Sequence, residues 1–171
     1  MKDKMAAYKS QISSVVVSSV IDTFNLMLRQ NVTAMALRSP RPPGPDMAVY
    51  ACVKLDQEDL SANFYFSFDR SLLMMTAAAF YEKDKDKQPG IQEDIACAVA
   101  NIVGGKVKAF LNRQGYAFDM GIPFVAKQGE QGSEDAVHVH FSYDRTGDNG
   151  LVVNYVMEEK RQAPAQTKGK S

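Results

Sequence analysis

The residues best suited to chemistry lie in one stretch of the chain, residues 91–114. Small and polar side chains recur there every three or four residues. They are Asp94, Cys97, Ala98, Asn101, Gly105, Lys108 and Asn112, and we call this set the stripe. At 100° per residue they fall within about 60° of one line along a helix. Among them, the Asn101 amide can both donate and accept hydrogen bonds.

The opposite side of the same stretch is apolar and is predicted to face the core. Its members are Ile95, Val99, Ile102, Val103 and Phe110. The stripe from Asp94 to Asn112 is therefore predicted to be exposed to solvent on a long helix packed against an antiparallel sheet. A solvated helix face usually carries long charged stems, whereas the stripe is flat around Ala98, Asn101, Gly104 and Gly105. Each glycine costs about 1 kcal/mol relative to alanine inside a helix. Two explanations stay open: close approach by another protein, or tight internal packing or a kink.

Other candidate sites are weaker. His138 and His140 alternate with apolar residues, so both face one side of a strand, and two such histidines can share a metal. No cysteine or carboxylate is placed to complete that site, so an ordinary sheet face is preferred. Cys52 and Cys97 have no metal or redox spacing and are interpreted as free thiols. No phosphate-binding glycine loop and no Ser/His/Asp order is found, and no metal site is predicted.

Composition limits the class of protein. The chain has 171 residues, which suits a single domain. Its 45% apolar content supports a core, and 20 basic residues balance 20 acidic ones. This balance argues against nucleic acid or an anionic membrane as the main partner. No stretch approaches the roughly 18 uninterrupted apolar residues of a membrane span, and no signal peptide is recognised. We therefore expect a soluble, cytoplasmic protein.

The elements that must position the stripe follow from periodicity and turn residues. Helical spacing predicts helices over 9–29, 70–81 and 91–114, the last ending at Gly115. Alternation predicts strands over 31–38, 47–55, 60–68, 116–126, 136–143 and 151–157. Polar or Pro/Gly-containing segments predict loops at 39–46, 82–90 and 127–135.

These elements predict an α+β fold. Short links after residues 55 and 143 suit hairpins, which implies an antiparallel or mixed sheet. Helices with one apolar face should pack on one side of that sheet. We expect a single domain over residues 1–158 and a disordered polar tail over 159–171.

Residues 94–125, DIACAVANIVGGKVKAFLNRQGYAFDMGIPFV, resemble the signature helix and following strand of the CheC/CheX/FliY chemotaxis phosphatase family. The matching positions are Asp94, Asn101, Gly105, Lys108, Leu111 and Gly115. The resemblance covers about residues 10–157 and is nearest to the CheX type, since one asparagine motif is found. The family pattern has Glu-x-x-Asn, but this chain has Ala98 in place of the glutamate.

The resemblance implies a function and a site. Asn101 would position the water that attacks the phosphoaspartate of a CheY-like receiver. Partner contacts would come from Asp94, Ala98, Gly104, Gly105 and Lys108. Mg²⁺ would be supplied by the receiver, so no cofactor is expected in this chain. A homodimer is also implied.

The missing glutamate leaves alternatives open. In the family this carboxylate is thought to pair with a lysine of the receiver. Asp94 and Glu93 are candidates to replace it, although aspartate is shorter and the distance is larger. The chain could instead be a non-catalytic module that binds a receiver, or a domain with another regulatory role such as ligand sensing.

Overall fold

The computed structural model describes residues 2–28, 33–37, 47–80, 90–127, 135–142 and 149–161. The predicted loop at 39–46 and nearly all of the other two loops lie outside these ranges. The described elements occur in an order close to that predicted from the sequence.

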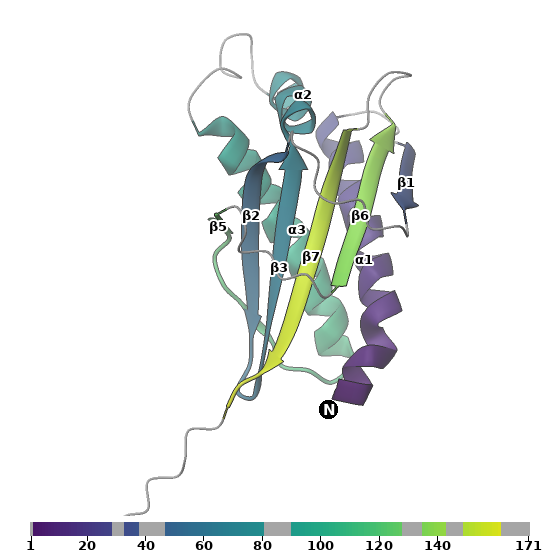
Figure 1. Ribbon diagram of the computed structural model, residues 1–171, viewed down its shortest axis with the longest axis vertical. Coiled ribbons are helices and arrows are strands. Elements are labelled where there is room, and N and C mark those ends of the chain that lie inside the picture. Colours follow the sequence, from purple (N-terminus) through teal and green to yellow (C-terminus); the bar gives the residue numbers. More distant parts are fainter. Residues whose placement is uncertain are drawn as a thin grey trace, which may run out of the picture.

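Every strand pair in the sheet is antiparallel. The strands are β1 (Thr33–Leu37), β2 (Met47–Asp56), β3 (Leu60–Asp69), β4 (Asp119–Met120), β5 (Phe124–Val125), β6 (Asp135–Ser142) and β7 (Asn149–Glu159). Their order is β1-β6-β7-β3-β2-β4, and β5 also pairs with β2 (Figure 1). The predicted antiparallel sheet is therefore confirmed.

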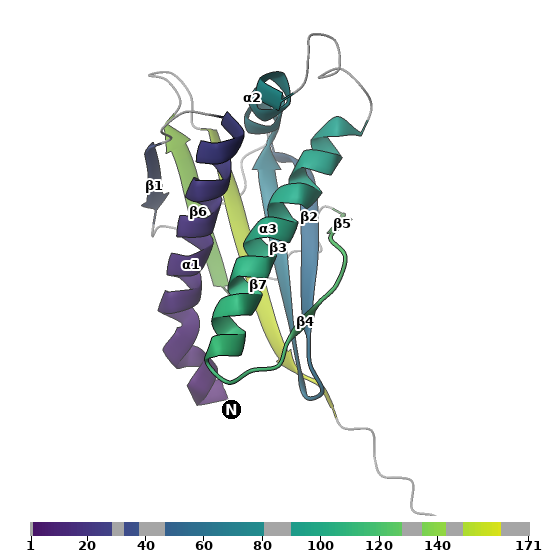
Figure 2. The same ribbon diagram turned by 180° about the vertical axis from the view of Figure 1, so that it is seen from behind.

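The helices cover one face of this sheet. They are α1 (Lys2–Leu28), α2 (Arg70–Phe80) and α3 (Ile91–Arg113). Figure 2 shows α1 and α3 side by side on that face. The Tyr8 ring of α1 meets the Phe110 ring of α3 edge-on, with centroids 6.3 Å apart. The predicted α+β architecture is confirmed.

The core lies between the sheet and the helices. On β3, Phe64, Phe66 and Phe68 are fully buried and stand in register with Tyr155, Val153 and Leu151 of β7. Burying one such side chain contributes about 1.5–3 kcal/mol. The alternation at residues 60–68 thus identified the side of β3 that faces the core.

Helix α1 is the longest helix and contains a long apolar segment. Its segment Ala7–Leu28 is long and apolar enough to cross a membrane, judged by length and composition alone. However, Ile12, Val16, Val20 and Phe24 are fully buried in the core at helical spacing. Packing against the sheet and α3 accounts for the apolar character of α1.

Three predicted boundaries were wrong. Helix α1 begins at Lys2, seven residues before the predicted start at residue 9. The single strand expected over 116–126 is instead the two short strands β4 and β5. Pro123 lies between them, and proline cannot donate a hydrogen bond to a ladder. At the C-terminal end, β7 continues to Glu159 and the Lys160 side chain is bonded, so the predicted end of the last strand at residue 157 was too early.

Candidate functional site on helix α3

Helix α3 presents the stripe because its other side is packed on the sheet. Val99, Val103, Val107 and Leu111 are fully buried. The helix ends where predicted: Gly115 has φ of +99°, a conformation that glycine adopts without strain.

Asn101 lies at the exposed centre of α3. Asp94, Ala98 and Asn101 are exposed, while Gly105 and Lys108 are partly exposed. Within the described part of the chain, no group is hydrogen-bonded to the Asn101 side chain. The predicted exposure of Asn101 on a long helix over an antiparallel sheet is confirmed. Its amide is available to an external partner or a water molecule.

Gly104 is buried, so its predicted place on the flat exposed surface of the stripe was wrong. A Cβ atom at this position would lie 2.7 Å from Val53 Cγ1 and 3.3 Å from Met120 Sδ. Gly104 therefore allows α3 to approach β2 closely. Gly105 is different, because a Cβ there would meet nothing within 4 Å among the described residues. Each of the two explanations considered for the glycine pair therefore applies to one glycine. Internal packing explains Gly104, and an open surface is found at Gly105.

Asn112 also has an internal role. Its Nδ2 donates to the Phe118 carbonyl at 3.1 Å, and the Phe118 N–H donates to its Oδ1 at 2.8 Å. These bonds hold the turn that leads from α3 into β4. The expectation that the whole stripe from Asp94 to Asn112 is exposed is therefore wrong at its C-terminal end.

Ile102 was predicted to face the core but is 42% exposed. It lies at the border of the buried arc, whose centre is occupied by Val103 and Val107. A helical period alone cannot fix such a border, because its position depends on which neighbouring elements cover the helix.

The electrostatics of the stripe leave its centre uncharged. Asp94 and Lys108 lie near its two ends, about 21 Å apart along the helix. Burial raises the pKa of the Cys97 thiol, and the charges of Asp94 and Glu93 raise it further. Cys97 thus stays protonated at neutral pH and is not an activated nucleophile. The exposed centre can orient a polar molecule through Asn101, but it offers no ionic anchor at Ala98.

The sequence analysis missed a group of exposed apolar side chains beside α3. Ile122, Phe124 and Val125 are 89%, 50% and 51% exposed. They lie in residues 119–126, which we call the edge segment because β4 and β5 pair with the outer edge of β2. The signal was present in the uncharged run MGIPFVA. We interpreted this run as part of one regular strand and therefore did not predict that its apolar side chains would be exposed.

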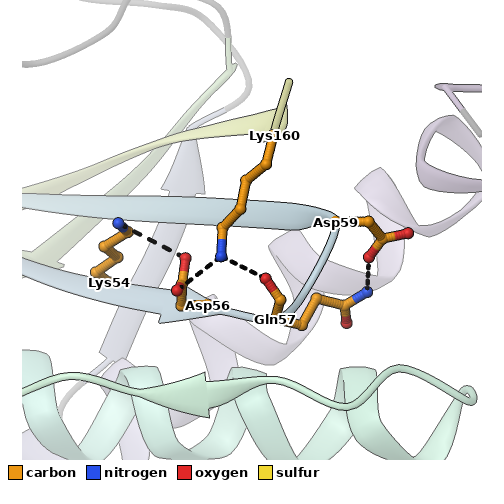
Figure 3. Close-up of polar contacts among 5 residues, drawn as sticks. All are labelled: Lys54, Asp56, Gln57, Asp59 and Lys160. Atoms are coloured by element: carbon orange, nitrogen blue, oxygen red, sulfur yellow. Dashed lines mark hydrogen bonds and ion pairs between the residues drawn. The ribbon is translucent and has the colours of Figure 1, made fainter. Parts of the chain in front are cut away.

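A polar cluster lies at the C-terminal end of β2, where Asp56 is in register with Asp119 of β4. Lys160 Nζ donates to Asp56 Oδ2 at 2.8 Å and also to the Gln57 carbonyl (Figure 3). The hydrogen bond from Lys160 holds the pKa of the Asp56 carboxyl below its ordinary value. Asp56 Oδ1 lies 3.6 Å from Lys54 Nζ. This cluster fastens the end of β7 to the β2–β3 hairpin.

The same cluster reaches the turn after α3. Gln57 Nε2 donates to Asp59 Oδ1 at 2.6 Å, and Gln57 Oε1 accepts the N–H of Ala117 at 3.2 Å. Except at Asp56 Oδ1, which has no hydrogen-bond partner among the described residues and only the ion pair with Lys54, these groups are hydrogen-bonded to each other or to backbone. We therefore assign the cluster a structural role.

Metal binding finds no support within the described ranges. No group of three or more His, Cys, Asp or Glu side chains is close enough there to hold an ion. His138 and His140 belong to β6, in backbone register with Val152 and Gly150, and their side chains lie outside the described part.

Comparisons with known proteins relate this geometry to a known fold. No protein-family model matches the sequence, and no curated protein matches it. Several solved structures are similar. The chemotaxis protein CheX from Vibrio vulnificus has a TM-score of 0.65 at 13% identity, over 86% of this chain and 96% of that chain.

Two further solved structures have a similar fold. CheX from Borrelia burgdorferi, solved as a complex with CheY, BeF₃ and Mg²⁺, has a TM-score of 0.64 at 17% identity, over 88% of this chain and 98% of that chain. A CheC-like protein from Shewanella oneidensis has a TM-score of 0.60 at 17% identity, over 85% and 96%. The chain therefore has the fold of the CheX and CheC-like chemotaxis proteins.

Proposed function

We propose that this protein is a chemotaxis signalling protein that binds a phosphorylated CheY-like receiver and hydrolyses its aspartyl phosphate. The observation that carries the proposal is Asn101, whose exposed amide lies at the centre of α3 and has no internal partner among the described residues. The fold supports it, since a similar CheX structure was solved as a complex with CheY.

For hydrolysis of the aspartyl phosphate, the main task of this chain is to position the attacking water molecule. A water oxygen attacks the phosphorus in line with the bond to the aspartate oxygen, that bond breaks, and inorganic phosphate and a free carboxylate result. The Asn101 carbonyl oxygen can accept a hydrogen bond from the water, and its NH₂ can donate to a phosphoryl oxygen. Mg²⁺ comes with the receiver, so this chain needs no cofactor. Holding water in this geometry lowers the entropic part of the barrier.

The rest of the contact surface is formed by exposed or partly exposed stripe residues, namely Asp94, Ala98, Gly105 and Lys108. Ala98 favours a second candidate function, a module that binds a receiver without hydrolysis. With alanine at this position, no carboxylate next to Asn101 can pair with a lysine of the receiver. The two candidates share one partner and one docking face and differ only in turnover.

Two further parts of the proposal come from the family resemblance. We place the protein in the cytoplasm, where it would meet the receiver, and we propose that it forms a symmetric homodimer. Pairing between copies is one way for a sheet to protect its edges. Sedimentation at high micromolar concentration should give twice the 18.9 kDa chain mass. A species of single-chain mass only would contradict the dimer.

The function is tested by dephosphorylation of a receiver from the same cell, charged with acetyl phosphate. The natural chain should accelerate phosphate release, and Asn101→Ala should reduce the acceleration about a hundred-fold or more. A suitable control is Gln114→Ala, which removes another exposed amide just beyond α3 and should change nothing. If Asn101→Ala retains full activity, the assigned role of Asn101 is wrong. Binding without acceleration would favour the non-catalytic module.

A further inference from the structure

The edge segment exposes three apolar side chains in a run of four residues. Ile122 is 89% exposed, and Phe124 and Val125 are about half exposed. Residues 120–126 carry no charge. Single exposed apolar residues are common, whereas several within one short segment mark a contact surface more often.

The edge segment borders the stripe. A Cβ atom at Gly104 would lie against Val53 of β2 and Met120 of β4, so the side of α3 at Gly104 faces this segment. Asn101 is rotated by about 60° from Gly104 and lies one turn nearer the helix start. Figure 2 shows the chain from β4 to β5 running along α3 on the side away from α1.

The register fixes which part of the edge segment is nearest to Asn101. Val125 is paired with Ala51, whereas Phe124 is paired with Cys52. Ala51 belongs to the core between the sheet and the helices. Successive residues of a strand point to opposite faces, so Val125 lies on the helix side of β5. Val125, half exposed, is therefore on the same side of the sheet as Asn101.

A typical protein interface is wide enough to include the edge segment when it is centred on Asn101. A stable complex covers about 800 Å² on each partner, a disc of about 16 Å radius. A helix with its side chains is about 10 Å across, and neighbouring strands are about 4.8 Å apart. A footprint of this size centred on Asn101 reaches Val125 on the helix side of β5 and the adjoining residue Ile122.

We propose that the edge segment is the second half of the receiver-docking surface, an inference that rests on the function proposed above. The receiver presents an uncharged, apolar patch to Ile122 and Val125 while its phosphoryl group reaches Asn101. These apolar contacts supply affinity at a surface where Ala98 provides no ionic pair. The occupant is the receiver, because only a body seated on Asn101 needs to cover both α3 and the edge segment.

The test measures binding of the full chain to a BeF₃-charged CheY-like receiver from the same cell. Ile122→Ser and Val125→Thr remove apolar contact at exposed positions, and threonine keeps the β-branched shape at Val125. Each should weaken binding, Ile122→Ser by about ten-fold or more. The matched control is Leu26→Ser on α1, where leucine is 79% exposed and binding should not change.

The outcomes separate this inference from the proposed function. If the natural chain binds the receiver but neither edge variant weakens binding, the inference is overturned and the function stands. If the natural chain binds no receiver, both fail. If Ile122→Ser instead converts a dimer to monomers in sedimentation and leaves receiver binding unchanged, the edge segment is a self-association surface and the inference is overturned.

Discussion

Two asparagines of helix α3 share one face but have different surroundings. Asn101 and Asn112 are three turns apart and differ by about 20° in direction. The Asn112 amide is bonded to both backbone groups of Phe118, whereas the Asn101 amide has no partner among the described residues. Residue type and helical phase are the same, so only the neighbouring chain distinguishes a structural asparagine from a candidate functional one.

The adjacent glycines repeat this contrast. Gly104 packs on Val53 inside the protein, and Gly105 faces open space. In both comparisons, one member is satisfied by the fold and the other is left for an external partner. The same substitution to alanine at both members of a pair, either the two asparagines or the two glycines, should therefore change the stability of the fold by different amounts.

The largest difference in stability is expected between the asparagines. Asn112→Ala leaves the N–H and C=O of Phe118, whose side chain is buried, without their present partner. We expect the free energy of unfolding to fall by about 2 kcal/mol or more. Asn101→Ala should change it by less than about 0.5 kcal/mol. Urea denaturation of both variants measures the difference, and equal losses would show that Asn101 is also structural.

A smaller effect is expected when the missing carboxylate is restored next to Asn101. Ala98 is exposed and lies three residues from Asn101 on the same face, so a glutamate there would reach the same docked partner. One charge-assisted pair should make Ala98→Glu bind the charged receiver at least about ten-fold more tightly. Titration of the receiver by both chains measures this. If neither chain binds any receiver, the resemblance describes the fold alone.

The glycines should respond to alanine with opposite signs. Gly104→Ala places a Cβ against the buried Val53 side chain, and we expect a loss of about 1 kcal/mol in unfolding free energy. The Cβ of Gly105→Ala meets no atom of the described residues within 4 Å, so this variant should gain about 0.5–1 kcal/mol from helix propensity. Thermal or urea unfolding gives both values. If Gly104→Ala were stabilising, close packing on β2 would not explain that glycine.

The smallest effect concerns the exposed polar cluster. Lys160→Met removes the hydrogen bond that lowers the pKa of Asp56, so this pKa should rise toward its ordinary value. A carboxyl with a lowered pKa stabilises the fold above the unfolded-state pKa, and this contribution disappears as the pH falls through the folded-state pKa. An NMR titration of the Asp56 carboxyl carbon measures the shift. An unchanged pKa would show that Lys160 does not control it.

The sequence by itself determined where most of the elements lie and which face of helix α3 is turned toward solvent. Alternation located β3 and its core side, helical spacing located α3, and Gly115 marked its end. The exposure of Asn101 followed from the same period. These features depend on neighbours within a few residues, which a linear pattern records directly.

Tertiary structure decided which members of the stripe are available to a partner. Gly104 is buried because α3 lies on Val53 of β2 and beside Met120 of β4, and Ile102 is exposed because no described element covers it. The edge segment borders α3 only because β5 pairs with β2, joining Val125 to Ala51 across a long stretch of sequence. Such contacts are set by how separate elements pack, and no local period encodes them.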